Sequence, residues 1–438
     1  MDKNNGAIYD ARKLGKPKMI ILGVQHMFAM FGATILVPIL TGLDISTTLL
    51  MAGLGTLLFH CITKFKVPAF LGSSFAFLGG YAAIKAFSPN DPNSMLPYAC
   101  LGVACAGLIY FILAAVIKAV GVEKVMRFFP PVVTGPIIIA IGLGLAPSAV
   151  SNCTTNWFLA VVALAVIVVF NIWGKGMAKI IPIILGLLIS YGTGLVLYFI
   201  SQANPDLIQN VPWLFSGGAD ANGVYQPIFD FTSLNTICDN ISKGHIFGSE
   251  GLIGIPIHWD KTVFGGIDYS NGALIASSII AIVPIAFATM MEHIGDICAI
   301  SSTTGNNYIK DPGLHRTLVG DGLATTLASL FGGPANTTYG ENTGVLALTR
   351  VYDPRVIRIA AYFAVAVSFF PIVSVIIGSI PSCIIGGISF VLYGMISAIG
   401  VRNVVENKVD FTKSRNLIVA AVILVCALGL SSDTVSFT

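Results

Sequence analysis

Residues 334–344 read PANTTYGENTG and lie between two long apolar regions, so Glu341 is expected at membrane depth. The β-branched threonines and the flanking glycines make this stretch a poor α-helix. Non-helical backbone at that depth is tolerated only where protein covers it or where it lines a cavity. A carboxylate inside the bilayer is costly and usually marks a substrate or proton pathway. The stretch therefore predicts a transport site on an interrupted membrane span.

A second acidic stretch, residues 292–296, reads EHIGD and ends another apolar run. Glu292 and Asp296 are four residues apart, so on a helix they share one face. Two intramembrane acidic clusters, one of them on a broken segment, strengthen the prediction of a transport site.

The composition is that of a membrane protein. Of 438 residues, 55% are hydrophobic and only 10% are charged, whereas soluble domains carry roughly 25% charged residues. Soluble enzyme classes are therefore excluded. The first 18 residues are polar, and the apolar run that follows is long enough to span a membrane, so no cleavable signal peptide is expected. The eight cysteines lack metal-type spacing, and we expect neither a metal nor a cofactor.

We expect about thirteen membrane spans, each judged against the ~20 residues that a spanning helix needs. They fall near residues 19–42, 46–63, 68–85, 97–117, 130–149, 156–173, 180–201, 272–298, 314–333, 337–349, 356–379, 381–400 and 416–430. The third and the tenth are too short or too interrupted to be plain helices. A protein built from two equal halves needs an even number of spans, so a fourteenth is expected beyond residue 438.

The basic residues predict the orientation of these spans. With the N-terminus in the cytoplasm, all of the 24 Lys and Arg residues face the cytoplasm except Lys85, Lys243 and Lys261. This alternation follows the positive-inside rule, and a missed or extra span would disrupt it. The sequence therefore predicts a multi-pass protein of the plasma (inner) membrane with a cytoplasmic N-terminus.

The two halves of the chain contain a similar sequence pattern. Residues 68–76 read PAFLGSSFA and match PANTTYG at 334–340 when a two-residue gap is allowed. Each stretch is third in a set of seven spans, and because seven is odd the second set crosses the membrane in the opposite direction. Paired interrupted spans in inverted repeats point to a transporter's binding site. The predicted order is a cytoplasmic tail (1–18), a first repeat (19–201), an extracellular loop (202–271) and a second repeat (272–438).

Four motifs in this order resemble the nucleobase–cation symporter-2 (nucleobase–ascorbate transporter) family, and among its members the bacterial uracil permeases. They are QHMFAMFGAT at 25–34, GSSFAF at 72–77, EHIG at 292–295 and the stretch 336–344. The resemblance runs from about residue 18 to the end of the sequence. It implies an all-α polytopic membrane fold of two inverted seven-span repeats. It also implies a core domain (19–117 and 272–379), a gate domain (130–201 and 381–438) and a homodimer.

The resemblance further implies a proton-coupled symporter that imports uracil by alternating access. Uracil offers two N–H donors and two carbonyl acceptors on a flat ring, so its site needs a carboxylate and free backbone amides. Glu292 and Glu341 are expected to accept from the ring, and Phe75 and Gly340 to donate from extended main chain. Tyr339 and Phe75 are expected to form flat walls.

The same resemblance assigns supporting roles. His26 and Ala33 of the first span are expected to support the site, and Tyr393 of the twelfth span to face the substrate from the gate domain. A lone histidine in an apolar helix more often satisfies a local hydrogen bond, so both interpretations of His26 stay open.

Proton coupling is expected at Glu292, Asp296 and Glu341, because burial favours the protonated form of a carboxyl group. The sequence departs from the uracil permease pattern at Asp296, where a histidine is expected. Two neighbouring carboxylates can share one proton, but the substitution leaves open whether the coupling chemistry and the base are the same.

Other functions fit less well. A xanthine or purine permease of the same fold would use the same carboxylates and remains the alternative. An anion exchanger would favour a basic residue or a bare helix N-terminus over Glu341. A channel filter would show rings of carbonyls or charges from repeated subunits, and an intramembrane enzyme would need a nucleophile–base pair or a metal. We therefore expect a non-enzymatic nucleobase transporter whose partners are uracil, membrane lipid and a second copy of the chain, with no nucleic acid.

Overall fold

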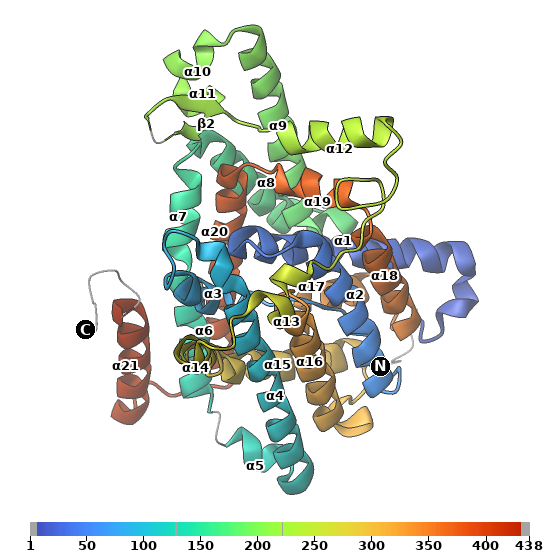
Figure 1. Ribbon diagram of the computed structural model, residues 1–438. Coiled ribbons are helices and arrows are strands. Elements are labelled where there is room, and N and C mark those ends of the chain that lie inside the picture. The colour runs from blue at the N-terminus through green and yellow to red at the C-terminus, as the bar shows by residue number, and fades with distance from the viewer. Residues whose placement is uncertain (1–6, 128–129, 221, 431–438) are drawn as a thin grey trace. The chain divides into compact units, whose positions relative to one another are not determined.

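The computed structural model describes residues 7–127, 130–220 and 222–430, without the side chains of Met126, Glu341 and Leu430. This part of the chain is mostly helical, as the sequence predicts, with four short strands. It divides into two compact units, each made of two separate segments of sequence (Figure 1). Unit 1 comprises Met1–Val125 and Ser233–Gly378, and unit 2 comprises Met126–Thr232 and Ser379–Thr438.

The α-helices and strands of unit 1 come from two segments that are far apart in the sequence. They are α1 (Lys16–Thr41), α2 (Ile45–Ile62), β1 (Leu71–Ser73), α3 (Leu78–Lys85), α4 (Leu96–Val120), α13 (Val263–Gly266), α14 (Gly272–Ile282), α15 (Ile285–Thr304), α16 (Leu314–Leu330), β4 (Asn336–Thr338), α17 (Gly340–Thr349), α18 (Pro354–Ser368) and α19 (Pro371–Gly378). Two more helices, α5 (Val122–Met126) and α12 (Thr232–Ser242), lie at the boundaries between the units.

Unit 2 has fewer elements. They are α6 (Pro131–Gly144), α7 (Ala146–Cys153), α8 (Trp157–Trp173), α9 (Pro182–Ala203), α10 (Asp206–Asn210), α11 (Pro212–Phe215), β2 (Ser216–Ala219), β3 (Tyr225–Pro227), α20 (Ser382–Glu406) and α21 (Ser414–Leu430). Strands β2 and β3 form a small antiparallel hairpin within the long polar stretch 202–271.

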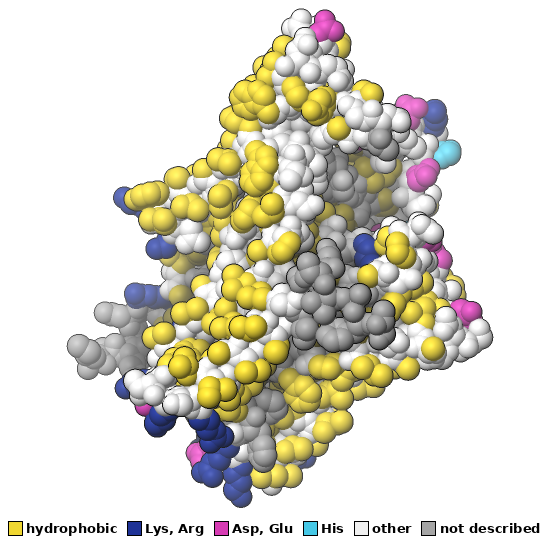
Figure 2. All heavy atoms as spheres, turned by 90° about the vertical axis from the view of Figure 1, so that its left-hand side faces the viewer, with side chains coloured by type: hydrophobic (Ala, Val, Ile, Leu, Met, Phe, Trp, Pro, Cys, Tyr) yellow, Lys and Arg dark blue, Asp and Glu magenta, His cyan; other side chains and the backbone are white. Residues whose placement is uncertain are grey.

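Seven helices in the described residues are long and apolar enough to cross a membrane, and α18 with α19 forms an eighth candidate bent by 87°. Large apolar side chains such as Trp173 and Phe199 lie on the surface, 69% and 65% exposed. Figure 2 shows broad areas of hydrophobic side chains on one face. Such surfaces are unusual for a protein in water and suit helices that face lipid.

Glycines allow the helices of unit 1 to pack closely. Where α4 and α16 cross, a Cβ atom added at Gly322 would stand 2.7 Å from the carbonyl oxygen of Gly107 and 2.5 Å from Cβ of Tyr110. Thr326 donates to the carbonyl of Ala104 at 3.1 Å beside this contact. Small residues that bring two backbones together are a common means of helix association in membranes.

Replacing Gly322 with Ala is therefore expected to lower the thermal midpoint of unfolding in detergent. The added methyl group would push the backbone of α4 away, and such overpacking costs about 1–3 kcal/mol. The control is Gly192→Ala in α9, where an added Cβ meets nothing within 4 Å. That change is expected to be neutral or slightly stabilising, because alanine favours a helix. Equal midpoints for the two variants would contradict this account of the α4–α16 crossing.

In unit 2, α20 packs against α6, α7 and α8. Added Cβ atoms at Gly386 and Gly387 would meet Cys153 of α7 and Ala160 of α8. Against α6, Ser397 donates to the carbonyl of Ile139 at 3.1 Å, and Asn403 donates to Thr134 at 3.0 Å. Helix α20 is thus the central helix of its unit.

Candidate functional site

The two interrupted stretches of the sequence meet as a pair of strands in unit 1. Strands β1 and β4 run antiparallel, with Leu71 opposite Thr338 and Ser73 opposite Asn336. Each strand is followed by a short helix: α3 begins at Leu78, and α17 begins at Gly340, one residue after the end of β4. The first amides of a helix have no partner within it. The arrangement therefore places the N-termini of α3 and α17 after paired strands.

Threonines of the neighbouring helices hold both strands. The N–H of Leu71 donates to Thr56 of α2 at 2.9 Å, and Thr325 of α16 donates to the carbonyl of Asn336 at 2.6 Å. The side chain of Asn336 also donates to the carbonyl of Met51 at 2.9 Å. These bonds satisfy backbone groups that would otherwise be buried without a partner, and this is what makes extended chain tolerable at membrane depth.

Tyr339 joins the strand pair to α1. It is buried, and its hydroxyl donates to the carbonyl of Ser73 at 2.9 Å and lies 3.2 Å from the hydroxyl of Thr34. Its ring packs on Gly72, where a Cβ atom would collide with it. Ser73 completes the contact by donating to the carbonyl of Thr34 at 2.8 Å. The predicted wall residue is thus held by both strands and by α1.

Helix α15 carries Glu292, His293 and Asp296, and the last two contact this region. Thr338 of β4 donates to a carboxylate oxygen of Asp296 at 2.9 Å, and a Cβ atom at Gly340 would stand 3.8 Å from the other oxygen. Asp296 is therefore in contact with the strand β4 and next to the start of α17. Glu292 and Asp296 are partly exposed, whereas His293 between them is fully buried.

His293 points to a carboxylate that sequence reasoning missed. Its Nδ1 lies 3.5 Å from Asp321 of α16 and 3.4 Å from the hydroxyl of Thr338, and both His293 and Asp321 are fully buried. The direction of the contact between His293 and Thr338 depends on the tautomer of the imidazole ring. The four side chains form a continuous polar path from Asp296 through Thr338 and His293 to Asp321.

Asp321 is a candidate proton-binding group, because its carboxylate is fully buried. Neither of its carboxylate oxygens has a hydrogen-bond partner within the described residues, because 3.5 Å exceeds the usual length of an N–H···O bond. Burying a lone carboxylate ion is costly, and a proton on the carboxyl group removes the charge. The signal was present in the sequence as a single acidic residue within the apolar span 314–333.

The remaining predicted residues are placed as follows. Phe75 lies partly exposed between β1 and α3, and Ala33 is buried in α1. His26 is also buried in α1; its carbonyl lies 3.5 Å from the side-chain nitrogen of Asn342, and its ring nitrogens have no partner among the described residues. Glu341 is the second residue of α17, and its side chain falls outside the described part of the structure.

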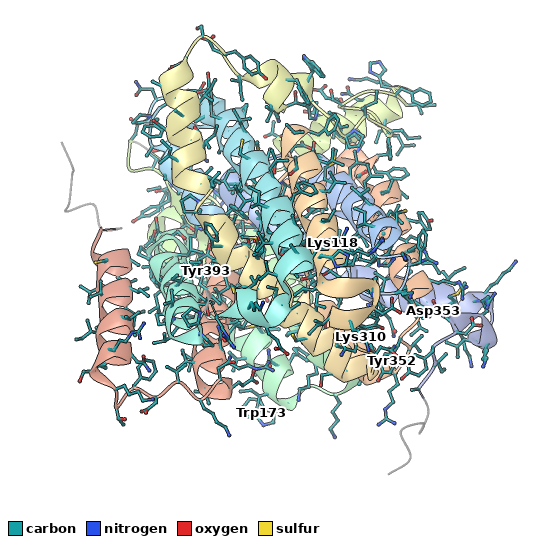
Figure 3. The ribbon with its side chains drawn as sticks, turned by 90° about the horizontal axis from the view of Figure 1, so that it is seen from below. Lys118, Trp173, Lys310, Tyr352, Asp353 and Tyr393 are labelled. Atoms are coloured by element: carbon teal, nitrogen blue, oxygen red, sulfur yellow. The ribbon has the colours of Figure 1, made fainter. Side chains whose placement is uncertain are left out.

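Tyr393 belongs to the other unit. It is buried in α20 (Figure 3), and its carbonyl oxygen leaves no room for a Cβ atom at Gly142 of α6. The described residues contain no cluster of three or more His, Cys, Asp and Glu side chains that could hold a metal ion. The polar groups gathered near the strand pair in unit 1 are those of Asp296, Thr338, His293 and Asp321.

Comparison with known sequences shows one family over nearly the whole chain. The profile of a family described as a permease family, which covers xanthine and uracil permeases, matches residues 17–435. A uracil permease of Bacillus caldolyticus is 39% identical over 421 residues, which cover 94% of this chain and 85% of that protein. A uracil permease of Bacillus subtilis (strain 168) is 38% identical over 423 residues, with the same coverage of 94% and 85%.

Comparison with solved structures shows a shared fold at low sequence identity. The transmembrane domain of the cyanobacterial bicarbonate transporter BicA superposes with a TM-score of 0.64 and 12% identity. The match covers 97% of this chain and 98% of that domain. At this identity the likeness concerns the fold alone.

Proposed function

This chain belongs to the nucleobase–cation symporter-2 family of permeases, and from that premise we propose that it imports uracil together with protons. Membership confirms the family predicted from the sequence and makes the chain a multi-pass membrane transporter rather than an enzyme. The observation that carries the choice of substrate is the 39% identity to a uracil permease over 94% of the chain.

The geometry of unit 1 supports a site for a flat neutral ring. In this proposal carboxylates of α15 accept from ring N–H groups, and main-chain amides at the starts of α3 and α17 donate to the ring carbonyls. In this proposal Glu292 and Glu341 bind the base through their side chains, and Phe75 and Gly340 through main chain. Tyr339, held by Ser73 and Thr34, keeps the strand pair in place and supplies a wall.

Coupling to protons is proposed to run through Glu292, Asp296 and Glu341, and the polar path adds His293 and Asp321 to this set. A proton on any of these carboxylates removes a charge from unit 1 and changes what the carboxylate can accept. Proton and base occupancy are thereby linked at one place. No separate ion site is needed for symport.

The arrangement of the chain supports alternating access between two parts. Threonines at equivalent places, Thr56 in the second predicted span and Thr325 in the ninth, bind the two strands of an antiparallel pair. Such a pair is what two inverted seven-span repeats would produce. We propose that unit 1 is the core domain, that unit 2, with Tyr393, is the gate domain, and that the protein works as a homodimer in the plasma membrane with its N-terminus in the cytoplasm.

The test is uptake of radiolabelled uracil by proteoliposomes, with and without an inward proton gradient. We expect accumulation that needs the gradient, collapses with a protonophore and is competed by uracil rather than by xanthine or guanine. Xanthine competing better than uracil would retain the fold and the carboxylates but assign the protein to purines. Uptake at the same rate and to the same level with and without the gradient would contradict proton coupling.

A further inference from the structure

A short segment ahead of α1 is docked onto the helices that carry the site. The sequence assigns residues 8–14 only to a cytoplasmic tail. In the structure, Ile8 forms a parallel bridge with Val351, and Ala11–Leu14 form a short 3-10 helix. Ala11 is fully buried against Val351 and Val356, so this segment has an apolar anchor of its own.

Ile8 binds the C-terminal end of α17. Its N–H donates to the carbonyl of Arg350 at 2.8 Å, and its carbonyl accepts from the N–H of Tyr352 at the same distance. Arg350 ends α17 in a left-handed conformation with φ 54°. Helices leave their last carbonyls without internal partners. Ile8 therefore gives the carbonyl of Arg350 a partner, and it also binds Tyr352, which follows the helix.

Tyr9 binds the C-terminal end of α15. Its hydroxyl donates to the carbonyl of Thr304, the last residue of that helix, at 2.7 Å. Its ring meets the edge of Tyr352, with 5.5 Å between ring centres. Two successive residues thus join the ends of α15, which carries Glu292 and Asp296, and of α17, which begins at the site.

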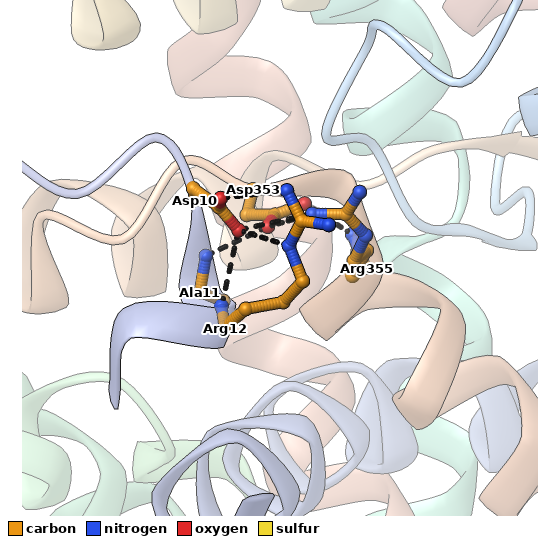
Figure 4. A network of polar contacts seen from close by, with 5 residues as sticks. All are labelled: Asp10, Ala11, Arg12, Asp353 and Arg355. Carbon is orange, nitrogen blue, oxygen red and sulfur yellow. Dashed lines mark hydrogen bonds and ion pairs between the residues drawn. The ribbon is translucent and has the colours of Figure 1, made fainter. Parts of the chain in front are cut away.

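A buried carboxylate fixes the same segment to α18. Asp353 caps α18 by accepting from the N–H of Arg355 at 2.9 Å, and its other oxygen accepts from the N–H of Ala11 at 2.7 Å. Arg355 bridges Asp353 and Asp10 at 3.2 and 3.1 Å. Figure 4 shows this network, and Figure 3 shows Tyr352 and Asp353 side by side in the link before α18.

The need for such an attachment follows from the length of α17. It has ten residues, and isolated helices of that length are only marginally stable. Only Tyr339 separates its first residue from β4, so that end is held by the strand pair. The other end is held by Ile8 and by the link to α18. The helix also packs on α1 and α15, and without the second attachment we expect its C-terminal end to fray.

We propose that residues 8–12 form an N-terminal brace that fixes the ends of α15 and α17 and so sets the spacing of the site carboxylates. Ile8 and Tyr9 are then positioning residues for transport. The expected effect of the brace on uracil transport rests on the proposed function. The expected effect on the stability of α17 does not.

The charges of the brace stay constant over the pH range of a transport assay. The hydrogen bond from Arg12 lowers the pKa of Asp10 from 3.8 to about 2. A carboxyl with a lowered folded-state pKa stabilises the fold above its unfolded pKa, and that contribution is lost as the pH falls from 3.8 through about 2. A pH dependence of uptake near neutrality therefore does not arise from Asp10.

The brace is tested with Tyr9→Ala and the conservative Tyr9→Phe in the full-length protein. We expect Tyr9→Ala to speed amide hydrogen exchange in residues 342–352 by about fivefold, which corresponds to one net hydrogen bond of about 1 kcal/mol. We expect a similar rise in KM for uracil at unchanged membrane abundance. Tyr9→Phe keeps the ring on Tyr352 and is expected to fall between Tyr9→Ala and wild type.

The matched control is Tyr98→Phe, which removes another tyrosine hydroxyl bonded to the main chain of unit 1, 3.0 Å from the N–H of Asp268. It is expected to leave exchange in 342–352 and KM unchanged. Wild-type exchange in Tyr9→Ala would overturn the brace. Faster exchange with an unchanged KM would overturn the positioning role. A wild-type protein without uracil uptake would reject the proposed function, while the exchange measurement would still decide on the brace.

Discussion

Replacing Glu292 with Gln is expected to lower uracil uptake about 5- to 50-fold at substrate concentrations near the wild-type KM. A glutamine places an N–H₂ donor where a carboxylate oxygen accepted, so a ring N–H would face another donor. Hydrogen bonds to charged groups contribute about 1.5–3 kcal/mol, which corresponds to roughly 10- to 100-fold in affinity. Glu341→Gln is expected to behave in the same way, because both carboxylates are proposed to bind the base.

The measurement is direct binding of uracil together with initial uptake rates, at equal amounts of protein in the membrane. The control is Glu406→Gln, which removes a carboxylate of α20 that pairs with Arg402 at 2.6 Å and is 60% exposed. An exposed pair of this kind contributes little, so uptake is expected to stay at the wild-type level. Wild-type affinity in Glu292→Gln would remove Glu292 from the site.

Replacing Asp321 with Asn is expected to uncouple uptake from the proton gradient. Asparagine has nearly the same shape but cannot bind a proton, and it removes the carboxylate that lies 3.5 Å from Nδ1 of His293. We expect gradient-driven accumulation to fall to the equilibrium level, while exchange of labelled for unlabelled uracil continues. We expect accumulation to be lost and exchange to continue because Asp321 does not contact the proposed base site itself. It is fully buried on α16 and is connected to Asp296 through His293 and Thr338.

Three further variants make this test specific. Asp268→Asn, in an exposed loop where the side chain accepts from Ser270, is expected to accumulate uracil normally. His293→Gln is expected to uncouple as Asp321→Asn does. The variant with both changes is expected to be no worse than either, because groups that act as one unit are not additive. Normal accumulation in Asp321→Asn would exclude Asp321 from the proton pathway.

The sequence alone determined the class of this protein and indicated the stretches that are proposed to form its site. Hydropathy and charge are local properties, so the spans and the two interrupted stretches are visible in the order of residues. The helical spacing of Glu292 and Asp296 is local as well, and the structure places both on α15. The family followed from short motifs for the same reason, and the comparisons confirm it.

Only the tertiary structure decided which residues meet. The pairing of Leu71 with Thr338, the approach of His293 to Asp321 and the docking of Ile8 on Arg350 each join distant parts of the chain. A single sequence does not specify such contacts, because they depend on how whole helices pack. Tyr339 shows the difference: its aromatic ring suggests a wall of the site, but its burial on Gly72 and its bond to Ser73 exist only because two strands from opposite halves of the chain lie side by side.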